Sequence, residues 1–182
     1  MIKPKIQFNY DISNNEIILN KALKSRNILV IGGAGTIGSN YIKQILKFKP
    51  SKITVVDFNE NGLTELTRDL RSSSLLDYNP EYITYPVNLL SDTFNKIFNS
   101  ETWQVVANFS AHKHVRSEKD KISVEALIKN NVYGAIKLLK LCELNPPKYF
   151  FSVSTDKAAN PVNIMGASKS LMEKLILSKK KN

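Results

Sequence analysis

Short apolar runs alternate with segments of helical period along most of this chain. Five runs are dominated by β-branched and aromatic residues and are too short for buried helices, so each predicts a strand: 28–31, 53–56, 82–87, 105–109 and 149–153. Between them, apolar residues recur every three or four positions, which predicts helices. Parallel strands need crossover connections, so this alternation specifies a parallel sheet covered on both faces. We expect an α/β fold with a doubly wound parallel sheet of about five strands.

The helical segments each have a predicted inward face. The positions expected to face the core are Ile37, Tyr41, Ile45 and Phe48; Leu63, Leu66 and Leu70; Phe94, Ile97 and Phe98; and Leu127, Leu138 and Leu139. Ser91 is placed to cap the third helix. The longest helix is expected from about residue 123 to 141, ending before Pro146 and Pro147. A last helix should start near Asn163 and carry Leu171, Leu175 and Ile176.

The first 26 residues allow two interpretations. Ile6, Phe8 and Tyr10 alternate as in a strand, but an arm lying over the domain fits equally well. We expect residues 1–26 to form an N-terminal arm or extension, residues 27–178 the α/β domain, and residues 179–182 a basic tail.

Composition narrows the class of protein. The chain has 182 residues, of which 42% are hydrophobic and 23% are charged, as expected of a folded domain rather than a disordered one. Its single cysteine, Cys142, excludes an internal disulfide framework and fits a reducing compartment. No apolar run is long enough to span a bilayer or to form a secretory signal. The expected location is cytoplasmic.

The net charge of +10 raises the question of a nucleic-acid partner. Part of the excess lies at the end of the chain, at Lys174, Lys179, Lys180 and Lys181. Nucleic-acid readers usually carry a dense basic stripe or an aromatic RNA-binding signature, and neither is present here. We interpret the charge as a solvated surface or a frayed basic tail, with no nucleic-acid partner.

A glycine-rich loop follows the first predicted strand and opens the next helix. Gly32, Gly35 and Gly38 stand three residues apart, with Thr36 and Ile37 between the last two. This spacing permits a tight turn, close approach of a pyrophosphate and tight helix–strand packing. The N–H groups and positive dipole end of the helix favour phosphates. The strand–loop–helix context favours dinucleotide binding over an ordinary glycine turn.

Asp57 ends the second predicted strand, nineteen residues after Gly38. A carboxylate there can accept hydrogen bonds from both hydroxyls of an adenosine ribose and would repel a 2′-phosphate. Phe58 and Asn59 supply no cation for that phosphate. We therefore prefer NAD to NADP. The alternative is that Asp57 is a turn or capping residue for the following helix.

Polar residues gather where the fourth and fifth strands end. Asn108 to His114 follow one strand and Ser152 to Lys157 the other, at the sheet edge where open α/β folds bind ligands. This concentration of titratable groups indicates chemistry, with plain surface loops as the alternative. His112 and His114 point in opposite directions if the strand continues, so no metal site is expected. Cys142 is interpreted as a small core residue.

Four strings of residues carry a resemblance to a known family: GGAGTIGS, AHKHV, KNNVYG and STDKAANPVNIMGASK. Over residues 27–178 the chain resembles the N-terminal part of an extended short-chain dehydrogenase/reductase. Within that superfamily it is similar to the CapD-like polysaccharide-biosynthesis group. The resemblance implies an NAD(P)-binding Rossmann domain and a nucleotide-sugar 4,6-dehydratase or epimerase. Its substrate would be of the UDP-N-acetylglucosamine type, used in surface-polysaccharide synthesis.

The resemblance also implies roles for individual residues. Those that would hold or line the cofactor are Gly32, Gly35, Thr36, Ile37, Gly38, Asp57, Asn108, Ala111 and Lys169. Ser154 or Thr155 would bond the sugar 4-hydroxyl, and Asp156 and Lys157 would be the acid and base of water elimination. Lys169 matches the lysine of the superfamily's Tyr-x-x-x-Lys motif, which grips the nicotinamide ribose.

The chain departs from the family pattern at three places, one of which is Pro86-Val87-Asn88, where relatives often place an acid facing adenine. Phe109 and Ser110 replace the usual pair of alanines, and Met165 stands at the tyrosine of the Tyr-x-x-x-Lys motif. A methionine there resembles one branch of the CapD-like group, but it carries no proton. Our hypothesis is that Lys157 or Asp156, aided by Lys169, takes over the proton transfer. The catalytic set inferred in this way includes Met165 as a position of altered chemistry.

Three functional classes are therefore compared. The first is a nucleotide-sugar dehydratase or epimerase, and the second an inactive NAD-binding module or half of a split enzyme. The third, a binder of nucleic acid or acidic surfaces, rests on charge alone. Relatives in the resembled family continue with a smaller substrate-binding domain. We therefore expect this chain to be the cofactor half, acting as a homo-oligomer or together with the absent C-terminal half.

Overall fold

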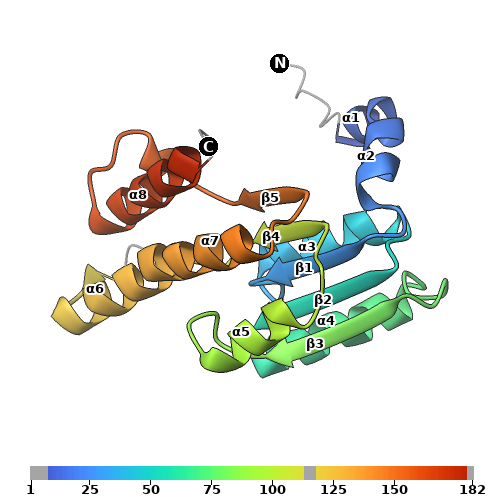
Figure 1. Ribbon diagram of the computed structural model, residues 1–182, viewed down its shortest axis with the longest axis horizontal. Coiled ribbons are helices and arrows are strands. Elements are labelled where there is room, and N and C mark those ends of the chain that lie inside the picture. The colour runs from blue at the N-terminus through green and yellow to red at the C-terminus, as the bar shows by residue number, and fades with distance from the viewer. Residues whose placement is uncertain (1–7, 113–117, 180–182) are drawn as a thin grey trace, which may run out of the picture.

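The computed structural model describes residues 8–112 and 118–179, and it is built around one parallel sheet. Its strands lie in the order β3-β2-β1-β4-β5, and every neighbouring pair is parallel (Figure 1). Their bounds are β1 (Asn27–Ile31), β2 (Lys52–Asp57), β3 (Glu81–Pro86), β4 (Val105–Asn108) and β5 (Tyr149–Ser152). The strand order reverses between β1 and β4, where ligands of such sheets bind. All five predicted strands and the doubly wound sheet are confirmed.

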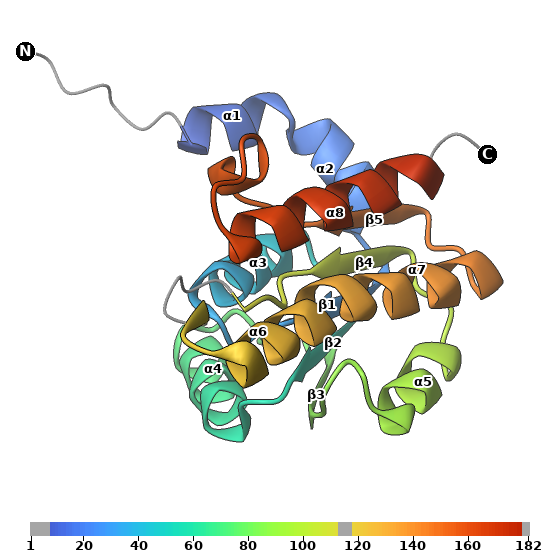
Figure 2. The same cartoon turned by 90° about the vertical axis from the view of Figure 1, so that its left-hand side faces the viewer.

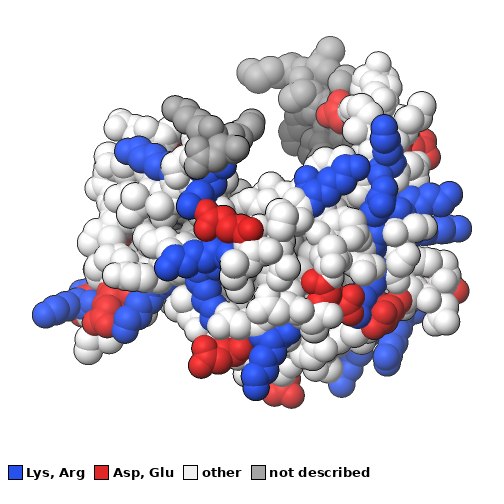
Figure 3. Space-filling view, in the orientation of Figure 1, with Lys and Arg blue, Asp and Glu red and all other residues white. Residues whose placement is uncertain are grey.

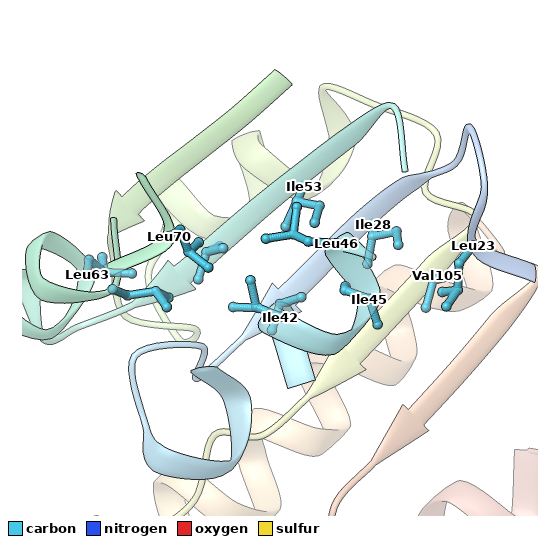
Figure 4. Close-up of a cluster of buried hydrophobic side chains, with 12 residues drawn as sticks. Leu23, Ile28, Ile42, Ile45, Leu46, Ile53, Leu63, Leu70 and Val105 are labelled. Atoms are coloured by element: carbon cyan, nitrogen blue, oxygen red, sulfur yellow. The ribbon is translucent and has the colours of Figure 1, made fainter. Parts of the chain in front are cut away.

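Helices cover both faces of the sheet because successive strand residues point to opposite sides. Ile28 and Val30 of β1 join a cluster with α3 (Thr36–Leu46) and α4 (Glu60–Ser72), drawn in Figure 4. Leu29 and Ile31 point the other way, to a second cluster with α5 (Asp92–Asn99) and α7 (Gly134–Leu144). The near-continuous burial of β1 and β2 follows from this two-sided packing.

The predicted inward faces are confirmed at all but one position. The leucines of α4, the apolar residues of α5, Leu127, Leu138 and Leu139 are buried, as is Ile45, and Tyr41 and Phe48 pack against the first cluster. Ser91 caps α5 by accepting a hydrogen bond from the Phe94 N–H. The exception is Ile37, which is 53% exposed. It lies in the first turn of α3, beyond the end of the strands, so its side chain borders the groove described below.

The predicted long helix is present as a continuous helical segment over residues 121–144, and it contains an irregular turn. α6 (Lys121–Ile128) passes through a π-helical turn, η2 (Lys129–Tyr133), into α7. Asp120 caps α6 by accepting from the N–H groups of Ile122 and Ser123. The short 3₁₀ turn η3 (Asp156–Ala158) and α8 (Ile164–Lys179) follow β5. α8 packs against η2 and α7 (Figure 2). On α8, Leu171 stays 46% exposed, and Leu175 and Ile176 are half-buried.

The N-terminal segment is helical. α1 (Phe8–Asn14) and α2 (Glu16–Leu23) include Phe8 and Tyr10, so the strand interpretation of these two residues is wrong, and Ile6 lies outside the described residues. Leu23 is buried in the first cluster, against which Leu19 and Ala22 also pack. Burial of this helical face outweighs an alternation of only three residues.

Charges are distributed over the surface and at the amino edge of the sheet. On the face shown in Figure 3, Lys and Arg are interspersed with Asp and Glu. At the start of β2, the buried Lys52 forms ion pairs with Glu81, at 2.8 Å, and with Glu101. These contacts tie the starts of β2 and β3 to the segment before β4. Within the described residues, none of the helices has the length and apolar character needed to cross a membrane.

Candidate functional site

Two cavities adjoin at the carboxyl edge of the sheet and form one groove. One is about 360 Å³ and lies over the ends of β1, β2 and β4, and the other is about 250 Å³ and lies between β4, β5 and α8. Both are lined by Gly32, Gly35, Phe109 and Ala111, so they meet beneath the glycine loop. The predicted ligand edge and the observed groove therefore coincide.

The glycine loop forms the middle of the groove. Gly32 has a φ of +74°, and a Cβ there would lie 2.5 Å from the Ser110 nitrogen. A Cβ on Gly38 would lie 2.5 Å from the Gly32 carbonyl oxygen, so the loop and α3 touch backbone to backbone. A Cβ on Gly35 would lie 3.5 Å from the Gly32 carbonyl oxygen, which is ordinary contact, and Gly35 lines both cavities. The loop is thus tight against the protein and open toward a ligand.

Asp57 is held in a fixed orientation beside this loop. Its Oδ2 accepts a hydrogen bond from the Ala34 N–H, and its Oδ1 accepts one from the Asn59 N–H, both at 3.0 Å. The first contact links the end of β2 to the loop after β1. Asn59, rather than Asp57, caps α4 with its side chain, by accepting from the Gly62 N–H. The carboxylate borders the larger cavity with Phe58 and Asn59.

The end of β4 supplies the floor between the two cavities. Asn108 is buried below the groove, where its Oδ1 accepts from the Ser110 N–H and hydroxyl and its Nδ2 donates to the Ser152 Oγ. Ala111 lines both cavities. The Phe109 ring packs against Tyr41 and Phe151, at centroid distances of 5.1 and 5.7 Å. Phe109 therefore occupies apolar space on the α3 side of the sheet.

The end of β5 presents hydroxyls and the Asp156–Lys157 pair. Ser154, Thr155 and Lys157 line the smaller cavity. In the described part of the chain, the Ser154 Oγ is buried and has no hydrogen-bond partner. Thr155 Oγ1 instead donates to Asp156 Oδ1 at 2.9 Å. This bond and one from the Lys157 N–H hold the pKa of the exposed Asp156 carboxyl below its usual value.

α8 forms the far wall of the smaller cavity. Met165 is 2% exposed and Lys169 4% exposed, and both line the cavity one helical turn apart. Lys169 Nζ donates to the Val153 carbonyl oxygen at 3.0 Å. Burial lowers the pKa of the Lys169 amine to about 8, against the opposing effect of Glu173. The amine is therefore far closer to its neutral form than an exposed lysine.

The structure gathers most, but not all, of the predicted site residues. Three do not line either cavity: Thr36 is exposed at the start of α3, Asn108 lies beneath the floor, and Asp156 points into solvent. The segment holding His114 lies outside the described residues. Within the described ranges, no group of three His, Cys, Asp or Glu is arranged to hold a metal.

Two supporting residues were not anticipated from the sequence. The buried Asn131, in the π turn, accepts from the His112 N–H and donates to the His112 carbonyl and to Ser168 Oγ. Glu118 accepts from the Met165 N–H at 2.7 Å and so caps α8. The KNNVYG string contains Asn131, but the sequence alone does not show that a π turn directs it toward both β4 and α8.

Comparison with known proteins identifies a family. A family model described as polysaccharide biosynthesis protein matches residues 28–182. An uncharacterized membrane protein of Methanocaldococcus jannaschii, MJ1061, is 37% identical over 85% of this chain and 44% of its own length. The capsular polysaccharide biosynthesis protein CapD of Staphylococcus aureus is 31% identical over 88% of this chain and 26% of its own. A UDP-N-acetylglucosamine 4,6-dehydratase (inverting) of Campylobacter jejuni is 30% identical over 84% and 43%.

Solved structures share the fold. The X-ray structure of Pen from Bacillus thuringiensis superimposes with a TM-score of 0.75 at 26% identity, covering 86% of this chain and 47% of that one. The Bordetella bronchiseptica enzyme WbmF, crystallised with NADH, gives a TM-score of 0.70 at 18% identity, covering 90% and 47%. The chain spans less than half the length of these relatives. With the family match covering most of its residues, the chain belongs to the polysaccharide biosynthesis protein family, whose CapD-like relatives include nucleotide-sugar dehydratases.

Proposed function

We propose that this chain is the cofactor-binding and catalytic part of an NAD-dependent nucleotide-sugar 4,6-dehydratase or epimerase of polysaccharide biosynthesis. The observation that carries the proposal is the single groove that joins the glycine loop and Asp57 to Ser154, Lys157 and Lys169. The C. jejuni relative, named as a UDP-N-acetylglucosamine 4,6-dehydratase, supports a substrate of that type. The single cysteine fits a cytoplasmic location for such an enzyme.

The residues around the groove fit a nicotinamide dinucleotide. Gly35 leaves room for a pyrophosphate at the N-terminus of α3, where unpaired N–H groups favour anions. Asp57 is oriented to accept the hydroxyls of an adenosine ribose. Among the described residues that line this cavity there is no Lys or Arg to compensate a 2′-phosphate, which favours NAD over NADP. Lys169 is in place to contact the other ribose. When bound, NAD would accept a hydride from the sugar and later return it.

The elimination step is proposed for Asp156 and Lys157, at the end of β5. Oxidation at C4 of the sugar makes the C5 proton acidic, so Lys157 can remove it while Asp156 protonates the departing 6-hydroxyl. A general acid needs a raised pKa, but the hydrogen bond from Thr155 lowers that of Asp156. Asp156 is exposed here, so the proposed role requires that bound substrate cover it. An epimerase would use the same oxidation without loss of water.

The direct test is incubation of the chain with NAD and UDP-N-acetylglucosamine, followed by mass spectrometry of the sugar nucleotide. Loss of water from the substrate is expected for a dehydratase, and an isomer of unchanged mass for an epimerase. If neither product forms, with the chain alone or with a polypeptide supplying the remainder of its relatives, the enzymatic proposal is wrong.

The second candidate function is an NAD-binding module without turnover, or half of a split enzyme. It is favoured by Met165, a buried thioether at the position where the superfamily's motif has a tyrosine. Restoring a hydroxyl with Met165→Tyr discriminates between the two. A large gain in turnover would show that the site has decayed. A measurable wild-type rate that Met165→Tyr leaves unchanged or lowers would support a working site that uses another group.

A further inference from the structure

The Lys169 amine is an unusual group for a buried position. Its Nζ has one oxygen acceptor, the Val153 carbonyl at 3.0 Å, and lies 3.7 Å from the Met172 sulfur. Among the residues that the structure describes, no carboxylate forms an ion pair with it. A buried ammonium usually has such a partner, because desolvation penalises the charged form.

The surroundings of Lys169 make the neutral amine easier to reach than in an exposed lysine. Burial lowers its pKa to about 8, and the carboxylate that acts against this shift is Glu173, on its own helix. The nearby elements bring His112 at the end of β4, Asp156 and Lys157 in η3, and Glu118 at the Met165 N–H. Asp156 is exposed and bonded to Thr155, and Glu118 is bonded to the Met165 backbone, so neither pairs with Lys169.

Met165 and Ser154 line the same cavity as Lys169. Met165 supplies an apolar thioether where the superfamily's motif has a hydroxyl, so the side chain at that position cannot accept the substrate's proton. The Ser154 hydroxyl is buried and has no partner in the described part of the chain. Thr155 already donates its hydroxyl hydrogen to Asp156. Ser154 is therefore the hydroxyl left free to bond an oxygen of the ligand.

We propose that the Lys169 amine is itself the base that takes the sugar hydroxyl proton, with the Ser154 hydroxyl hydrogen-bonded to the same oxygen. The inference rests on the proposed function and deepens it. The O–H bond breaks and its proton goes to Nζ, which becomes an ammonium. The hydrogen on the carbon that bears this oxygen would leave as a hydride to the oxidised nicotinamide, and that carbon and oxygen would become a carbonyl. In a dehydratase the hydride would return to the sugar at C6 after water has left, and in an epimerase it would return to C4. Either return restores the oxidised cofactor, and release of the proton from Nζ restores the amine.

The first test measures the protonation of Lys169 and does not depend on turnover. NMR of the full chain labelled at the lysine side chains would be followed across pH, and the Lys169 signal assigned by its loss in Lys169→Arg. We expect it to titrate near pH 8, apart from the other lysines, and to move when NAD is added. A titration at the ordinary value of 10.5 would overturn the proposal, because the amine would then be fully charged at neutral pH.

The second test measures the rate of the first hydride transfer. Reduced nicotinamide absorbance would be recorded in a single turnover with UDP-N-acetylglucosamine, with NAD affinity measured separately. Lys169→Arg keeps the positive charge but cannot accept a proton, so we expect a loss of about 10²–10⁴-fold in rate. Ser154→Ala should lose about tenfold, as for one hydrogen bond. The exposed Lys174, on the same helix, provides the matched control Lys174→Arg, which should equal wild type.

The outcomes separate this proposal from the proposed function. A wild-type chain that binds no NAD refutes the proposed function. A chain that reduces NAD while Lys169→Arg keeps the wild-type rate and pH profile refutes only the role of Lys169. If NAD binds but is not reduced, the NMR titration decides: a Lys169 pKa near 8 supports the proposal, and one near 10.5 refutes it.

Discussion

Replacing either of two loop glycines by alanine distinguishes the role of the loop in packing from its role in ligand binding. In Gly38→Ala the new Cβ would lie 2.5 Å from the Gly32 carbonyl oxygen, so that oxygen must move by about 0.9 Å to reach ordinary contact at 3.4 Å. Overpacking of this kind costs about 1–3 kcal/mol. Alanine is the better helix former, but its gain is partial in the first turn of α3. We expect a net loss of about 1–2 kcal/mol, or a fall in Tm of about 2–8 °C.

Gly35→Ala should weaken NAD binding without lowering stability. Its φ of −73° and ψ of 161° suit alanine, and the nearest atom to the new Cβ is 3.5 Å away. Stability should therefore change by less than about 0.5 kcal/mol. The methyl group would stand in the groove, however, where Gly35 lines both cavities. Loss of one charged hydrogen bond to a phosphate, about 1.5–3 kcal/mol, corresponds to a weakening of NAD binding of about 10–100-fold.

The assay combines thermal unfolding without ligand and calorimetric titration with NAD. Gly38→Ala should lose both stability and NAD affinity, and Gly35→Ala only affinity. If Gly35→Ala binds NAD as tightly as wild type, the phosphates do not lie at this loop and the proposed orientation of the dinucleotide is wrong. An unchanged Tm for Gly38→Ala would mean that the loop can shift at no cost.

Three further changes test the supports of the groove and the sheet. Asp57→Asn keeps an acceptor for the Ala34 N–H but removes the charge. Titration should show weaker NAD binding and a smaller preference for NAD over NADP. An unchanged ratio of the NAD and NADP affinities would contradict the assignment of Asp57. Lys52→Met leaves two part-exposed carboxylates without their cation and should lower unfolding stability in urea by about 1–3 kcal/mol. Burial by itself would lower the pKa of Lys52, but its two carboxylates raise that pKa above 10.5. The stability lost in Lys52→Met should therefore be measurable at neutral pH and should disappear only above pH 10.5. Asn131→Leu leaves the His112 N–H and carbonyl unpaired and should cost about 1–3 kcal/mol, and equal urea midpoints would refute the bridging role.

The sheet was predictable because its signals are local. Each strand is a short run of β-branched and aromatic residues, and both faces are covered, so β1 and β2 are apolar almost throughout. The turn at the glycine loop was predictable for the same reason, since three glycines between a strand and a helix indicate a tight turn. Asp57 followed because it directly ends a strand whose neighbour carries that loop.

Other features depend on contacts that are distant in sequence. Ile37 fits the apolar period of α3, but the helix starts beyond the strand ends, where no core remains to cover it. The π turn at Asn131 is stabilised by His112 and Ser168, nineteen and thirty-seven residues away, and no local propensity indicates it. The N-terminal helices likewise depend on docking of Leu23 on a cluster from later strands.

The chemistry of the site shows the same division between local and distant causes. Adjacent Asp156 and Lys157 draw attention as an acid–base pair, because the STDK string is compact and specific. Their neighbours in sequence do not determine burial, and in the fold Asp156 is exposed with a lowered pKa. Burial falls instead on Lys169, which is brought to the end of β5 by the packing of α8 on η2 and α7. A buried amine without a carboxylate partner is poised to exchange a proton near neutral pH, and an exposed carboxylate is not. In the proposed reaction, proton transfer from the sugar hydroxyl and elimination of water would therefore place different demands on the two residues. Lys169 is already buried in the folded chain, whereas Asp156 would have to be covered by bound substrate.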